Sequence, residues 1–427
     1  MAKLNFWNRE FGRNIRFKVI LVFIFITILL LAIIISKHLL TYENLSVQSK
    51  QYQNGIFGRS VFEQNPNATL GNRADPNYRI HFPLDHRPHV DFDIEWWYLT
   101  ANLHGVDEED KPQYFGLQWT LFRFRNPAQL KFEDAENTWG NQHIYMAHAS
   151  VHSKDKHWFA EKFARGAVGN AGTMDEPFEL FIDNWQWINT EDEQNLLPAK
   201  LHFSIPLVAQ KSDAQVAPNS NNSNSEKHVE TLSVTLNLSQ SGPYVKHGDN
   251  GYSIKSSNGQ HASHYYSAPF VDVAGQFKIL NTESKSAISV SGKAWFDQEW
   301  TSQLLDTATL GWDWLSLHLQ DGSKVMAFRM RLRDQEDHIT GSYISPKGVL
   351  TTLAPASIQL TPENFTVVNS KRLPLSWRLT IPSRNIDIQI KSRKTEQWNP
   401  AFVSYYEGMV EVSGSHLGEG FLELTGY

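Results

Sequence analysis

The sequence predicts an all-β fold built of sandwiches or barrels. After residue 80 almost no stretch has helical periodicity, whereas short segments with alternating apolar and polar residues recur to the C-terminus. Turn signals separate these segments, and Asp321-Gly322 is typical of a β-hairpin. Alternating segments lie at 115–121, 233–238, 288–292, 315–320, 385–390 and 410–414.

Two parts of this strand-rich region also resemble each other. Residues 95–125 and residues 297–333 each contain an acidic, tryptophan-bearing segment, then a second tryptophan-bearing segment, then one that ends in arginine. A duplicated β-domain is the simplest explanation.

The N-terminus predicts a membrane anchor. Basic residues in 1–18 precede an uninterrupted apolar run, 19–36, which with its flanks supplies the roughly twenty residues that a bilayer requires. The charge bias predicts a cytoplasmic N-terminus and an exported remainder, hence a single-pass inner-membrane protein with periplasmic domains if the cell is Gram-negative. The alternative is a cleaved signal peptide. We expect an uncleaved anchor, because the run is long for a signal peptide and "SKHLLTYENL" (36–45) is a poor cleavage site.

Two polar segments are predicted to connect structured parts. Residues 37–80 are weakly patterned and are interpreted as a tether. Residues 211–230 are rich in Asn and Ser, and because they lie between two strand-like segments we interpret them as a disordered hairpin loop.

Composition excludes several classes of function. The net charge is −6 and no basic run is present, so nothing favours nucleic acid as a partner. The chain has no cysteine, which excludes disulfides and thiolate nucleophiles. Aromatic residues make up 12% of the chain, including 14 Trp. This content indicates either aromatic-rich β cores or a pocket for a large apolar or unsaturated ligand.

No cofactor or metal is predicted. No phosphate-binding loop, dinucleotide-binding or G-x-S-x-G motif occurs. Two histidine groups have loose metal-ligand spacing, but neither matches a known signature. They are His86, His89 and Asp91, and His143, His148 and His152.

The carboxylates among the tryptophans are candidate functional residues. Because side chains alternate along a strand, Asp297 shares one face with Trp295 and Glu299, as Glu95 does with Asp93 and Trp97. A buried carboxyl without a cationic partner has a raised pKa and can act as a general acid. The alternative is a structural ion pair with a buried arginine, the candidates being Arg123, Arg125, Arg329 and Arg331.

Several strings resemble the AttH/CrtC family, in order, from about residue 80 to the C-terminus. That family includes carotenoid 1,2-hydratases and periplasmic proteins associated with ABC transport systems. The resemblance implies two tandem lipocalin-like β-barrel domains, which we place at 81–265 and 270–427. The strings are "EWWYLTANL", "FGLQWTLFRF", "HYYSAPF", "GKAWFDQEW", "GWDWLSLHLQDG", "YYEGMVEVSG" and "FLELTGY".

The resemblance also implies a site. In the hydratase branch an aspartate, two residues after an aromatic, protonates a terminal isoprenoid double bond, and water captures the cation. That aspartate matches Asp297 and the aromatic matches Trp295, while an upstream His-x-aromatic pair matches His264 and Tyr266. Aromatic faces stabilise a carbocation without attacking it. Further residues expected at the ligand are Glu95, Trp97, Glu299, Trp312 and Trp314.

Two functions remain open from the sequence. One is an exported carrier of a lipid or another hydrophobic small molecule, serving an ABC transporter. The other is an enzyme that hydrates or isomerises an unsaturated hydrophobic substrate by acid catalysis.

Overall fold

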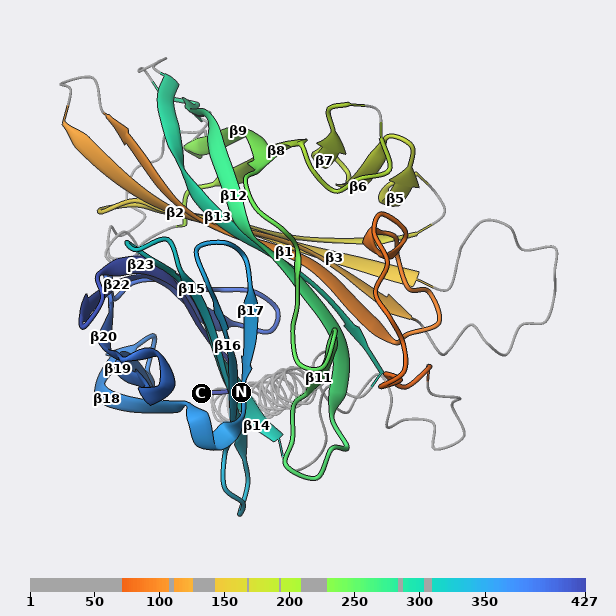
Figure 1. Cartoon of the computed structure of the whole chain (residues 1–427). Helices are drawn as coiled ribbons and strands as arrows, with labels where there is room; N and C mark the ends of the chain where they lie inside the picture. Colours follow the sequence, from red (N-terminus) through yellow and green to blue (C-terminus); the bar gives the residue numbers. More distant parts are fainter. Residues whose placement is uncertain are drawn as a thin grey trace, which may run out of the picture. The chain divides into compact units, whose positions relative to one another are not determined.

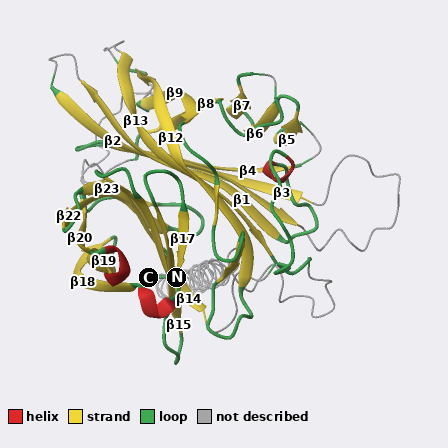
Figure 2. Ribbon diagram, in the orientation of Figure 1, coloured by secondary structure: helices red, strands yellow, loops and turns green. Residues whose placement is uncertain are grey.

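In a computed structural model of the protein, the described residues form two antiparallel β-sheets, and their only helices are single-turn 3₁₀ helices (Figures 1 and 2). The all-β prediction is thereby confirmed. The structure describes residues 71–106, 111–125, 143–166, 169–191, 193–208, 229–282, 287–302 and 309–427.

The first sheet curls into a nearly closed barrel. Trp158 on β4, at one end of the sheet, forms an isolated bridge with Leu207, which directly follows β8. The strand order is β4-β3-β2-β1-β13-β12-β9-β8-β7-β6-β5, with β10 and β11 paired to β12. The elements are η1 (Leu84–His86), β1 (Ile94–Val106), β2 (Pro112–Arg125), β3 (His143–His152), β4 (His157–Arg165), β5 (Ala171–Asp175), β6 (Phe178–Ile182), β7 (Trp185–Asn189), β8 (Ala199–Pro206), β9 (Thr231–Gln240), β10 (Val245–Lys246), β11 (Tyr252–Ile254), β12 (Ala262–Leu280) and β13 (Ala287–Thr301).

The second sheet forms a half-barrel. Its order is β17-β16-β15-β14-β23-β22-β20-β19-β18, with β21 paired to β22. The elements are β14 (Thr309–Leu319), β15 (Lys324–Leu332), β16 (His338–Ile344), β17 (Leu350–Leu353), η4 (Pro355–Ser357), β18 (Gln359–Val368), β19 (Lys371–Ile381), η5 (Pro382–Arg384), β20 (Ile386–Ser392), β21 (Trp398–Asn399), β22 (Tyr405–Gly414) and β23 (Gly418–Leu424). The predicted hairpin at Asp321-Gly322 joins β14 to β15, and Gly322 adopts the positive φ (89°) that such a turn uses.

The expected boundary between residues 265 and 270 falls inside a strand. β12 pairs with β9 on one side and with β13 on the other, and β13 pairs with β1. Both strands therefore belong to the first sheet, and the two sheets divide the chain after Thr301. The alternation of side chains could not predict this pairing, because it identifies a strand without identifying the strand's partners.

The first sheet has a different core on each face. Its inner face carries a packed aromatic core that includes Trp97, Trp119 and Phe296. Its outer face carries Tyr98 and Trp295, which join side chains of the second sheet in a separate cluster. The pattern follows from strand geometry, since consecutive residues such as Trp97 and Tyr98 point to opposite faces.

The predicted N-terminal anchor, 19–36, lies outside the described residues, as do most of the tether (37–70 of 37–80) and most of the loop (211–228 of 211–230). Among the described residues, no helix has the length and apolar character needed to cross a bilayer.

Candidate functional site

A cavity lies between the outer face of the first sheet and the second sheet. The volume that the centre of a water molecule can occupy within it is about 80 Å³, and the cavity is partly open to solvent. Its walls are aromatic with a few titratable groups. The aromatic residues are Trp96, Tyr98, Phe122, Trp312, Trp314, Phe328 and Tyr405, and the titratable groups beside them are Lys255, Asp297, Glu299 and Glu423.

Asp297 is held in this wall by three donors. It lies on β13, and its side chain is buried. Tyr265 OH donates to Oδ2 at 2.9 Å, Trp295 Nε1 donates to Oδ1 at 2.6 Å, and the Ser267 hydroxyl also donates to Oδ1. No Lys, Arg or His among the described residues forms an ion pair with Asp297. Its carboxyl is therefore fixed by neutral groups alone.

The environment makes Asp297 a weak acid with a transferable proton near neutral pH. Burial raises the pKa of Asp297 to about 7, against the opposing effect of the hydrogen bonds from Ser267, Trp295 and Tyr265, and the charge of Glu299 raises it further. A carboxyl in this range is populated in both protonation states near neutrality, as general acid catalysis requires.

Glu299, on the same face, has a cationic partner. Lys255 Nζ lies 2.8 Å from Glu299 Oε1, and the Ser263 hydroxyl donates to the same oxygen. The ammonium also lies 4.6 Å from the ring centre of Tyr265 and 4.7 Å from that of Phe328. Glu299 is therefore compensated, whereas Asp297 is not.

A buried chain of hydrogen bonds runs from Asp297 through Ser267 and His247 to Ser342. His247 Nε2 lies 2.6 Å from Ser267 Oγ, and His247 Nδ1 lies 2.8 Å from Ser342 Oγ. Burial, aided by the charge of Lys255, lowers the pKa of His247 to about 3, so the ring is neutral at pH 7. Because Ser267 donates to Asp297, its oxygen accepts from the Nε2–H of His247, and Nδ1 then accepts from Ser342.

The structure brings together only some of the predicted site residues. Four of them line the cavity. Trp295 does not line it, but it lies on the same face of β13 and donates a hydrogen bond to Asp297. The four are Asp297, Glu299, Trp312 and Trp314.

His264 and Tyr266 were expected beside Asp297, but they lie on the other face of the sheet. Tyr266 belongs to the inner core, and its hydroxyl contacts His86 Nδ1 at 2.7 Å. The intervening residue Tyr265, together with Ser267, reaches Asp297 instead. A shift of one residue along a strand is enough to reverse the face on which a side chain lies.

Glu95 and Trp97 also lie on the inner face, away from the cavity. Glu95 is fully buried, and its Oε2 lies 3.1 Å from Nε of the fully buried Arg123. His89 Nδ1 lies 2.7 Å from Oε1, and Gln298 Nε2 donates to the same oxygen at 2.9 Å. Burial raises the pKa of Glu95, but His89, Arg123 and Gln298 outweigh it and leave the pKa below its ordinary value.

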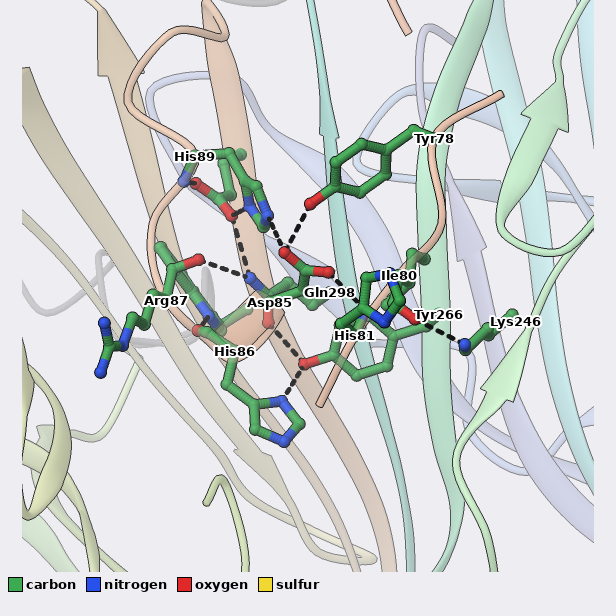
Figure 3. A network of polar contacts seen from close by, with 12 residues as sticks. Tyr78, Ile80, His81, Asp85, His86, Arg87, His89, Lys246, Tyr266 and Gln298 are labelled. Carbon is green, nitrogen blue, oxygen red and sulfur yellow. Dashed lines mark hydrogen bonds and ion pairs between the residues drawn. The ribbon is translucent and has the colours of Figure 1, made fainter. Parts of the chain in front are cut away.

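The inner-face network continues into the segment before β1 (Figure 3). Asp85 Oδ1 accepts from Tyr78 OH at 2.6 Å and lies 3.2 Å from His89 Nε2. Trp97 Nε1 donates to the carbonyl of His86. These contacts tie residues 78–92 to the inner face of the sheet. The structural ion pair, which was the alternative for each carboxylate, is thus found on this face between Glu95 and Arg123.

The histidine groups with metal-like spacing are engaged otherwise. His148 lies 2.8 Å from Glu161 and 3.1 Å from Tyr405 OH, and His89 binds Asp85 and Glu95. Within the described ranges, no group of three or more His, Asp or Glu side chains could hold a metal ion.

Sequence reasoning missed several residues of the site. Alternation places Tyr265 on the face opposite His264 and Tyr266, but only the register of β12 against β13 shows that this is the face of Glu299. Lys255 and His247 come from a weakly patterned segment that gave no signal. Glu407 and Glu423 stand in the strings "YYEGMVEVSG" and "FLELTGY", but only the pairing of β22 with β23 shows that they are neighbours.

The fold and the site together define a two-sheet β protein with a buried, uncompensated acid in an aromatic cavity between the sheets. The family model described as AttH-like matches residues 73–427, so the chain belongs to the AttH-like family. Comparison with curated proteins gives no match.

Two solved structures are similar to this one. The first is a protein assigned as AttH from Nitrosomonas europaea, with 26% identity and a TM-score of 0.66 over 83% of this chain and 99% of that one. The second is kievitone hydratase from Nectria haematococca, with 15% identity and a TM-score of 0.53 over 84% of this chain and 95% of that one. The second likeness shows the shared fold alone.

Proposed function

We propose that the protein binds an unsaturated hydrophobic molecule in the cavity between its sheets and protonates one of its double bonds, with Asp297 as the general acid. The net reaction is a hydration or an isomerisation. The observation that carries the proposal is the environment of Asp297, a buried carboxyl at an aromatic wall with hydrogen-bond donors but no cationic partner among the residues that the structure describes.

The chemistry fits the residue types in the wall. Protonation of an alkene needs a desolvated acid whose pKa is near the operating pH, and burial places the pKa of Asp297 at about 7. The resulting carbocation needs electron-rich faces that do not attack it, and Trp312, Trp314 and Phe328 border the same space.

The comparisons support this choice of reaction class only in part. Kievitone hydratase has the same overall fold, so this architecture is compatible with a hydratase in another protein. The choice between a hydratase and a carrier therefore depends on Asp297 and not on the relatives.

The test is an exchange experiment with squalene as the probe, since its ends carry trisubstituted isoprenoid double bonds. Detergent-dispersed squalene is incubated with the protein in D₂O, and incorporation of deuterium and formation of alcohol are followed by mass spectrometry. We expect both with the unmodified protein, and a loss of about 10²–10⁴-fold with Asp297→Asn. The matched control is Glu411→Gln, because Glu411 is exposed on β22.

Tight binding of squalene without exchange or alcohol would contradict catalysis and leave the carrier function. The melting temperature of each variant is measured alongside, so that loss of activity is separated from loss of folding.

The location is a further part of the proposal. We propose that residues 19–36 anchor the protein in an inner membrane with the two sheets on the periplasmic side, where subunits of an ABC transporter are the partners to test. The support is the basic segment before the apolar run. A reporter fused after Tyr427 should be active only if exported, and activity confined to the cytoplasm would contradict this orientation. Copurification of the full chain with transporter subunits would support the partnership, and its absence after mild crosslinking would count against it.

A further inference from the structure

The wall of the second sheet carries a carboxyl that the proposed reaction has not yet used. Glu423 lies on β23 and lines the cavity that Asp297 also lines. Trp312 Nε1 donates to Glu423 Oε1 at 2.8 Å and fixes its orientation. The cavity thus has acidic groups on both of its facing sheets, Asp297 and Glu299 from the first and Glu423 from the second.

A second carboxyl lies next to Glu423 on the neighbouring strand. Glu407 on β22 is the cross-strand partner of Glu423, so the two side chains lie on one face with their Cβ atoms about 5 Å apart. Glu407 is buried, and its Oε2 has no hydrogen-bond partner among the described residues. Two carboxylates this close cannot both ionise, so the pair retains one proton.

The hydrogen bonds of the site connect the two walls. Tyr98 on β1 is the cross-strand partner of Asp297, and its hydroxyl donates to Glu407 Oε1. In the other direction Trp314 Nε1 donates to the hydroxyl of Tyr265, which in turn donates to Asp297. The positions of the acids on the two walls are therefore fixed relative to each other.

The two glutamates differ in how they titrate. Burial, together with the charge of Glu423, raises the pKa of Glu407 well above its ordinary value, so Glu407 keeps the shared proton. Burial raises the pKa of Glu423 to about 7, against the hydrogen bond from Trp312, and the charge of Glu299 adds to the rise. Glu423 is the member of the pair that gains and loses a proton near neutral pH.

We propose that Glu423 is the second catalytic residue of the cavity, the base that takes a proton from the water that attacks the carbocation, with Glu407 and Tyr98 as its positioning residues. This inference rests on the proposed function. Asp297 gives its proton to one alkene carbon, and the π bond breaks to leave a cation on the other carbon. The water oxygen forms the C–O bond, and a water proton goes to the Glu423 carboxylate. The product is an alcohol, and transfer of a proton from Glu423 back to Asp297 through solvent restores both groups.

The other carboxyls are less suited to this role. Glu299 is occupied by Lys255 at 2.8 Å. Glu407 does not line the cavity and keeps its proton. Asp297 lies on the first sheet and, once deprotonated, could accept a proton only from water on the face of the alkene that it has just protonated, whereas Glu423 lies on the second sheet.

The experiment separates formation of the cation from its capture. Squalene is incubated with the full chain in D₂O containing ¹⁸O-labelled water, and two products are measured, namely alkene carrying deuterium and alcohol carrying ¹⁸O. Deuterium exchange into the alkene requires only that the cation forms and loses a proton again. Formation of the labelled alcohol also requires capture by water.

We expect Glu423→Gln to lose about 10²–10⁴-fold in formation of ¹⁸O alcohol while deuterium exchange into the alkene stays within about threefold of the unmodified protein. Asp297→Asn should lose both products, and the exposed control Glu411→Gln should lose neither. Glu407→Ala, which removes the acceptor of the Tyr98 hydroxyl, should lower formation of ¹⁸O alcohol by about 10–10²-fold through misplacement of Glu423. Glu407→Gln, whose amide oxygen can still accept that hydrogen bond, should recover most of the lost alcohol formation.

Each contrary outcome has a distinct meaning. Full alcohol formation by Glu423→Gln would overturn this inference and leave the proposed function intact. Equal loss of both products in a folded Glu423→Gln variant would also overturn it, since Glu423 would then be needed to form the cation. Absence of both products in the unmodified protein would overturn the inference and the proposed function together.

Discussion

The two faces of the first sheet hold buried carboxyls with opposite properties. Glu95 on the inner face and Asp297 on the outer face lie on neighbouring strands, β1 and β13, and both are buried. Glu95 contacts Arg123 and His89, and its pKa is lowered in spite of burial. Within the described part of the chain Asp297 has only neutral donors, and burial raises its pKa to about 7. Burial alone therefore does not decide the role of a carboxyl, because a cationic partner changes the direction in which its pKa is shifted.

The largest effect on stability is expected on the inner face. Glu95→Gln leaves the fully buried guanidinium of Arg123 without its carboxylate. We expect the free energy of unfolding to fall by about 3–5 kcal/mol, measured by denaturant titration. Glu411→Gln, the exposed control, should change it by less than about 0.5 kcal/mol. A Glu95→Gln variant as stable as the unmodified protein would remove the structural role assigned to this pair.

A smaller effect is expected from the compensated pair in the cavity. Lys255→Met removes the cation that faces Glu299 but keeps the length of the side chain. We expect a loss of about 1.5–3 kcal/mol, because a hydrogen bond to a charged group is lost while the bond from Ser263 to Glu299 remains. Adding Glu299→Gln should recover part of that loss in a double-mutant cycle. If the two losses simply add, Lys255 and Glu299 do not act as a pair.

The smallest effect on stability is expected at Asp297, and it should depend on pH. Because its pKa is higher in the folded state (about 7) than in the unfolded state, the folded protein binds more protons between about pH 4 and pH 7. Asp297 therefore reduces stability progressively as the pH rises through that window. Asp297→Asn removes this dependence, so its stability relative to the unmodified protein should improve from pH 4.5 to pH 8.

Denaturant titrations at pH 4.5, 6 and 8 measure this difference directly. The Glu95→Gln variant provides the contrast, because the pKa of Glu95 is lowered and its stabilising contribution is lost only as the pH falls. If Asp297→Asn became relatively less stable as the pH rose, Asp297 would have to be a compensated, ionised group like Glu95.

Much of the fold could be predicted from the sequence, because alternation and turn residues are local signals. The hairpin at Asp321-Gly322 and the strand character of 385–390 and 410–414 are examples. The pairing of β12 and β13 with the first sheet could not be predicted, because it brings together residues that are far apart in the chain, as in Glu95 beside Trp300.

Part of the site could likewise be predicted from the sequence and part could not. Asp297, Glu299, Trp312 and Trp314 stand in distinctive strings and do line the cavity. His264 and Tyr266 lie one residue away from Tyr265 and Ser267, which contact Asp297, and a shift of one residue places a side chain on the opposite face of a strand. Glu95 was expected at the ligand because it shares a face with Trp97. The sequence does not show which face of the sheet lines a cavity and which face packs against a buried arginine.

The central claim is that the ligand binds on the outer face of the first sheet, between the sheets, and not inside the first barrel. Photolabelling tests it most directly. An isoprenoid hydrocarbon that carries a diazirine is bound to the unmodified protein and activated by light, and the labelled residues are identified by mass spectrometry. We expect adducts on residues of the cavity wall such as Trp312, Trp314 and Phe328, suppressed by excess squalene. Adducts concentrated on inner-face residues such as Trp97 and Trp119 would contradict the account.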